Sequence, residues 1–211
     1  MTAHLTLAGR VLVFVFGVSI ASGAAYAHSG NAQAGPDSGV KIPGVTHGQM
    51  AVIGQFSGQI TDLASRQFAP DEDFRRILNY ARIQQTYCAW GLMPGSVSDE
   101  ASPFNECSHA YLAALQSILL RMTAMSPPDP RVATLAHSVD VAMIEEGSGL
   151  ILCAFSAETF NTALILKPDW WAVPYHQASL ASLLAATLIA LAMIAAAARF
   201  LRAPQTGRQP G

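Results

Sequence analysis

The chain has 211 residues, of which 51% are hydrophobic and only 12% are charged. Soluble domains average about 25% charged residues, so the composition excludes a disordered polyelectrolyte and favours membrane-embedded segments. Three cysteines are too few for a disulfide-based scaffold. Between residues 28 and 176 there are fourteen acidic and eight basic residues, a net charge of −6. Because phosphate contacts need Lys and Arg, we expect no nucleic-acid partner.

The first 27 residues have the pattern of a secretory signal peptide. Arg10 precedes an apolar run at 11–20, and an A-x-A cleavage motif occupies positions 25–27. A retained membrane anchor is the alternative. The apolar run is short for a span of about 20 residues, so we expect cleavage after Ala27. Residues 28–45, rich in Gly, Pro and Ala, are expected to form a flexible leader.

The second terminal apolar segment covers residues 177–198, which carry no charge and suit one transmembrane helix. An aromatic segment at 169–176 precedes it, as expected at a membrane interface, and a basic tail at 199–211 follows. Basic residues stay on the cytoplasmic side. The sequence therefore predicts a single-pass protein of a bacterial inner membrane, with its N-terminal domain in the periplasm.

Residues 46–168 are predicted to form an all-α, antiparallel bundle of four or five helices. Apolar residues recur at three- and four-residue steps in four segments that begin at Thr46, Pro70, Ser102 and Asp129. A fifth apolar stretch runs from 150 to 166, and we expect it to be a buried bundle helix. A second membrane span is the alternative. It would place the arginine tail on the periplasmic side of the membrane and Glu158 in lipid.

Two of the cysteines occupy matching positions in this bundle. Cys88 lies near the end of the second helix and Cys107 near the start of the third, both on the predicted core face. In an antiparallel pair these positions fall at similar height, and the expected compartment is oxidising. We therefore predict a Cys88–Cys107 disulfide rather than two buried thiols. Cys153 has apolar neighbours and is expected to be an inert buried thiol.

The connection between these two helices is long for a helical hairpin. It is rich in large apolar side chains, namely Trp90, Leu92, Met93 and Phe104. A long loop closed by a disulfide is a candidate contact surface for a partner protein. The alternative is a loop constrained only for stability.

One weak metal-binding pattern is present. Cleavage after Ala27 would make His28 the first residue, whose free amine and imidazole together can chelate copper. His47, with Met50 one turn later, offers an imidazole and a thioether, which also suit copper. The alternative is an incidental histidine at a permissive cleavage position, in which case no cofactor is expected.

No catalytic motif is recognisable in the sequence. His137 and Asp140 could form an acid–base pair, but such i,i+3 pairs are more often solvated. His109 is expected to face solvent. Our first hypothesis is a non-enzymatic accessory or subunit that contacts another envelope protein. The alternatives are a periplasmic copper- or metal-handling protein and, third, an unidentified periplasmic enzyme.

Overall fold

The computed structural model describes residues 38–93, 95–127, 129–146, 155–156 and 158–202. The predicted signal peptide, residues 28–37 of the leader with His28, Cys153 and the end of the basic tail lie outside these ranges. The described part is mostly helical. Its α-helices are α2 (His47–Ser65), α3 (Glu72–Tyr87), α4 (Asn105–Thr123), α5 (Pro130–Glu145) and α6 (Gln177–Arg202).

The helices α2 and α5 begin at their predicted capping residues, and α3 begins two residues after Pro70, its predicted start. The Thr46 hydroxyl accepts a hydrogen bond from the Gln49 backbone N–H at 3.1 Å, and the Thr46 N–H donates to the Gln49 side chain at 2.8 Å. This reciprocal capping box satisfies two of the open N–H groups of α2. Asp71 caps α3 through the Phe74 N–H at 2.6 Å. Asp129 caps α5, whose first residue is a proline.

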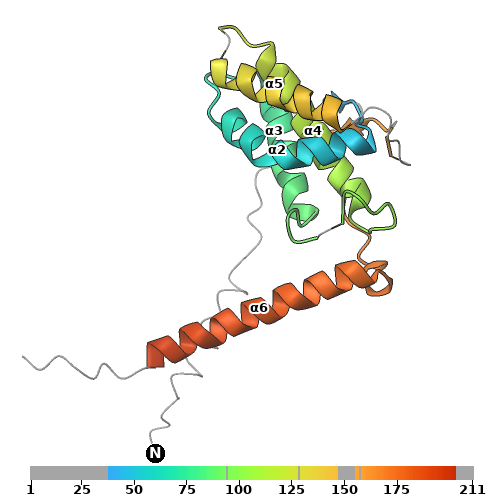
Figure 1. The fold of residues 1–211 in the computed structure, drawn as a ribbon, viewed down its shortest axis with the longest axis vertical. Helices are drawn as coiled ribbons and strands as arrows, with labels where there is room; N and C mark the ends of the chain where they lie inside the picture. Colours follow the sequence, from blue (N-terminus) through green and yellow to red (C-terminus); the bar gives the residue numbers. More distant parts are fainter. Residues whose placement is uncertain (1–37, 94, 128, 147–154, 157, 203–211) are drawn as a thin grey trace, which may run out of the picture. The chain divides into compact units, whose positions relative to one another are not determined.

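The central helix is α4, which contacts α2, α3 and α5 (Figure 1). Every residue from Cys107 to Leu115 is buried, on all faces of the helix. The predicted core face of this helix is confirmed, because its members are all buried, namely Cys107, Tyr111, Leu112, Leu115, Ile118, Leu119 and Met122. The helix begins at Asn105 rather than at the predicted Ser102, after a turn in which Ser102 Oγ accepts from the Phe104 N–H.

Two short strands correct the predicted leader and the predicted fifth helix. Strand β1 (Lys41–Ile42) pairs antiparallel with β2 (Phe160–Asn161). Ile42, Val45 and Phe160 are all buried in the main core. The leader therefore does not extend to 45, and the described part of 150–166 is not helical. Strands of two residues are too short to show the alternating pattern by which sequence reveals a strand.

Helix α6 is preceded by the 3₁₀ turn η2 (Val173–Tyr175). Its stretch from Gln177 to Leu201 is 25 residues long and includes the predicted span 177–198, and its most apolar 18-residue window has a mean hydropathy of 2.4. This window is not buried by other parts of the described chain. In length and composition the helix can cross a membrane.

Candidate functional site

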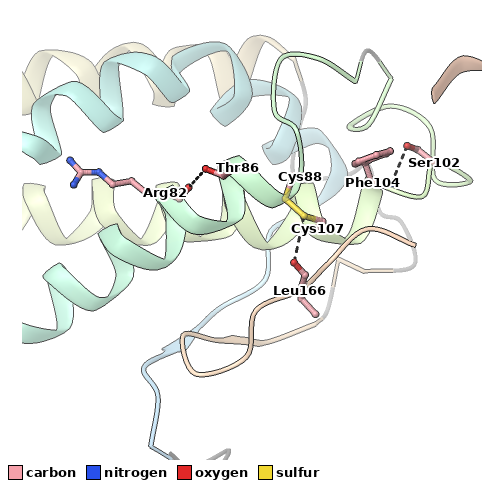
Figure 2. Close-up of a disulfide and its surroundings, with 7 residues drawn as sticks. All are labelled: Arg82, Thr86, Cys88, Ser102, Phe104, Cys107 and Leu166. Atoms are coloured by element: carbon pink, nitrogen blue, oxygen red, sulfur yellow. Dashed lines mark hydrogen bonds between the residues drawn. A yellow bond between two sulfur atoms is a disulfide. The ribbon is translucent and has the colours of Figure 1, made fainter. Parts of the chain in front are cut away.

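The predicted disulfide is confirmed. Cys88 directly follows the last residue of α3, and Cys107 lies in the first turn of α4. The two sulfur atoms are bonded, and the Cα atoms are 5.5 Å apart (Figure 2). The Cys107 Sγ atom also lies 3.8 Å from the carbonyl oxygen of Leu166. The bond therefore links the ends of the hairpin loop (residues 88–104) and lies against the segment that leads towards α6.

The four apolar residues of the predicted contact loop have different surroundings. Trp90 is partly buried, with its ring centre 5.1 Å from that of Tyr111 in the core. Met93 and Phe104 are buried in a second apolar cluster with Val173. Leu92 is 58% exposed. Leu92 is therefore the one of the four whose side chain is mainly available to a partner.

The hairpin loop contacts the linker segment (residues 167–176), which precedes α6. The rings of Phe104 and Trp170 meet edge to face, with centres 5.5 Å apart. The Asp169 N–H donates to the Pro103 carbonyl at 3.2 Å. At the end of the linker segment, His176 Nε2 lies 2.9 Å from Asp99 Oδ2. We call this set of contacts the loop–linker junction.

Electrostatics at the loop–linker junction favour an ionised Asp99. The hydrogen bond from His176 is the main reason that the pKa of Asp99 lies below its ordinary value, and the Ala101 N–H adds to the effect. The His176 ring is itself oriented by Ser179, whose hydroxyl lies 2.8 Å from Nδ1. An ionised carboxylate and an oriented imidazole thus meet beside the first turn of α6.

Two histidines approach each other at the other candidate site. The ring centres of His47, in the first turn of α2, and His109, on α4, are 6.3 Å apart. The expectation that His109 faces solvent is wrong, since its exposed fraction is 0%. Helices surround α4 on several sides, and the Phe155 ring lies 5.7 Å from His109. Burial, together with the nearby His47, lowers the pKa of His109 to about 4.

Of the three predicted metal ligands, His47 and Met50 lie among the described residues and His28 does not. The Nδ1 atom of His47 is buried and has no hydrogen-bond partner among the described residues. Met50, one turn later on α2, is fully buried. No group of three or more His, Cys, Asp or Glu side chains suited to a metal occurs in the described ranges. Sequence spacing missed His109 because it pairs with His47 only through the packing of α4 against α2.

The predicted acid–base pair lies on the surface. His137 and Asp140 are both exposed on α5. Beside Asp140 is a surface groove of about 330 Å³ between α2, α4 and α5. Its apolar lining includes Leu120, which is 62% exposed, and Ile144, which is 80% exposed. Exposed apolar side chains grouped in a groove are typical of interaction sites.

A further set of polar side chains is buried inside the bundle. Gln84 of α3 is fully buried, and neither atom of its side-chain amide has a hydrogen-bond partner in the described structure. Tyr80, one turn earlier, is also buried, and burial with the nearby charge of Glu106 raises its pKa to about 12. These groups lie in the core between α3 and α4 rather than at an open site.

A scan of the chain against protein-family models found no match, and searches of curated proteins and of solved structures found none either.

Proposed function

We propose that this protein is a single-pass, membrane-tethered periplasmic accessory or subunit that acts by binding another envelope protein. The observation that carries the proposal is the apolar groove between α2, α4 and α5. Large apolar side chains in solvent are costly unless a partner covers them. Leu120 and Ile144 are both exposed there, although each lies on a helix whose opposite face is in the core.

The chemistry of the groove defines the partner further. Its apolar lining includes Leu119, Val139 and Met143, and its rim includes Asp140. Glu145 and Glu146 follow Ile144 at the end of α5. A rim with acidic residues favours a partner with basic residues beside its apolar anchors. We infer that the occupant is a basic amphipathic helix of a second membrane-anchored protein, bound in the helix-in-groove manner.

The membrane tether supports this assignment by confining the bundle to the membrane surface. Helix α6 has the length and hydropathy of a membrane span. The basic residues that follow it and the predicted signal peptide both favour a cytoplasmic C-terminus. A reporter fused after Gly211 tests this topology. Activity of a periplasmic reporter at that position, or a mature protein that retains Met1, would contradict it.

Site-specific photo-crosslinking in living cells tests the partner. A photoreactive residue is placed at Leu120 or at Ile144, and the matched control is placed at Ala133, which is exposed on α5 outside this groove. We expect both groove positions, but not Ala133, to crosslink to one discrete membrane protein. A crosslinked dimer of this chain would assign the groove to self-association. Equal yields at all three positions would contradict a specific partner.

We retain the hairpin loop as a second, smaller contact surface. Leu92 is the exposed apolar residue of the predicted set, whereas Met93 and Phe104 are buried against Val173. We propose that the hairpin loop mainly joins the bundle to the linker segment, and that Leu92 extends the partner surface. A photoreactive residue at Leu92 then crosslinks to the same protein as one at Ile144.

A further inference from the structure

We propose that His47 and His109 bind one copper(I) ion between their imidazole rings. This site is independent of the proposed partner groove. It differs from the pattern found in the sequence, which combined His47 with His28 and Met50. The structural observation is the approach of the two rings, whose centres lie 6.3 Å apart although they belong to different helices.

The spacing of the rings suits a two-coordinate ion. With a metal–nitrogen distance of about 2.0 Å, a metal in the plane of an imidazole lies about 3.2 Å from the ring centre. Two rings bound on opposite sides of one ion therefore have centres about 6.4 Å apart, close to the observed 6.3 Å. Two ligands in tetrahedral geometry would bring the centres to about 5.2 Å. The observed separation is therefore compatible with a nearly linear pair, which copper(I) readily accepts.

The available ligands also favour copper(I) over zinc. A structural zinc ion takes four protein ligands, and a catalytic one takes three. Within the described ranges no third His, Cys, Asp or Glu joins these two histidines to form such a set. Imidazole nitrogen is a good copper ligand. A pair of neutral imidazoles is sufficient for a linear copper(I) centre.

The burial of the site also favours a singly charged ion. Because His109 is fully buried, an ion held at its ring would be buried as well. A buried ion without a charged ligand is costly, and the cost is lower for a single charge than for a double one.

The two histidines have different access to solvent. His47 is partly exposed, whereas His109 is fully buried with the Phe155 ring 5.7 Å away. The Nδ1 atom of His47 is itself buried and has no hydrogen-bond partner among the described residues. An unpaired nitrogen of this kind is costly unless something binds it.

The test is a copper(I) titration of the full chain in detergent micelles, in competition with a chromophoric copper(I) chelator under reducing, anaerobic conditions. We expect one copper(I) per chain, with an affinity that falls by more than about 100-fold in His47→Gln and in His109→Gln. The matched control is His137→Gln, which replaces an exposed histidine on α5 and should leave the affinity unchanged. Equal affinity in all of these proteins would overturn the proposal.

Two further variants separate this site from the pattern in the sequence. His28→Gln and Met50→Leu should each change copper(I) affinity by less than threefold, because a linear site uses neither residue. A 100-fold loss in His28→Gln alone would place the ion at the N-terminus and overturn the assignment. A comparable loss in Met50→Leu would overturn the two-coordinate geometry. Tighter binding of zinc than of copper(I) would also contradict it.

The wild-type protein provides a readout that does not depend on the folding of a variant. X-ray absorption at the copper edge should show two nitrogen neighbours and the signature of linear copper(I). Imidazole NMR signals of two histidines, and only two, should shift on addition of one equivalent of silver(I), a redox-inert analogue. A three- or four-coordinate spectrum, or shifts of all the histidines together, would contradict the site.

Discussion

The Nε2 atom of His176 lies 2.9 Å from the Oδ2 atom of Asp99, across 77 residues of sequence. Asp99 belongs to the hairpin loop, and His176 is the last residue before α6. The same loop is closed by the Cys88–Cys107 disulfide and shares the apolar cluster of Met93, Phe104 and Val173. One short region therefore connects the bundle to the residues that lead into the predicted membrane span.

Replacement of His176 by Gln should raise the pKa of Asp99. The lowered pKa depends first on the hydrogen bond from His176, and then on the backbone N–H of Ala101 and on the charge interaction with His176. The contact therefore stabilises the fold above the ordinary pKa of the carboxyl, and this contribution is lost as the pH falls through the lowered value. A ¹³C NMR titration of the Asp99 carboxyl measures the change. Equal values in wild type and variant would show that the junction does not form in solution.

Loss of the disulfide should destabilise the bundle. Cys88 and Cys107 are 19 positions apart, and closing a loop of this length contributes about 3 kcal/mol in the chain-entropy model. Cys88→Ala should therefore lower the free energy of unfolding by about 2–4 kcal/mol, as measured by urea denaturation in micelles. The control is Cys153→Ala, which should leave the disulfide intact. A non-reduced peptide map that links Cys153 to either partner would contradict the prediction.

Acid should destabilise the protein through His109. Its pKa is about 4 in the folded chain and about 6.5 when unfolded, so the unfolded state binds more protons in this interval. The free energy of unfolding of the metal-free protein should fall by about 3 kcal/mol as the pH drops from about 6.5 to about 4. Urea denaturation at several pH values measures this slope. His109→Leu should flatten it, and His137→Leu, at an exposed position, should not.

Replacement of Gln84 by Met should stabilise the bundle. The Gln84 side chain is fully buried, and its amide has no hydrogen-bond partner in the described structure. A thioether of similar shape removes the cost of desolvating that amide, about 1–2 kcal/mol. The midpoint of urea unfolding should therefore rise. Gln85→Met, at the neighbouring and less buried position, is the control and should have little effect. A lower midpoint for Gln84→Met would indicate that the amide binds an internal water.

Local patterns in the sequence predicted four helices of the bundle and the capping residues of α2 and α5. A helix cap depends on residues within one turn, as in the pair Thr46 and Gln49. The spacing of apolar residues in α4 predicted its buried apolar face, because that spacing also depends only on neighbouring turns of one helix. The disulfide followed from positions on two predicted helix faces, combined with the antiparallel geometry of two consecutive helices. The candidate membrane span near the C-terminus was likewise predictable from the length and composition of one segment.

The remaining features depend on contacts between distant segments, and no local pattern encodes them. The pairing of β1 with β2 joins residues about 120 positions apart, as in the 2.9 Å hydrogen bond from the Val40 N–H to Thr162 Oγ1. His109 is buried because other elements surround α4. From the pattern of its own helix alone, the side chain was expected to face solvent. Sequence by itself determined the helices, the disulfide and the candidate span, through interactions within a few turns. Only the tertiary structure brought His47 to His109 and Asp99 to His176, because packing between elements decides which distant polar groups meet.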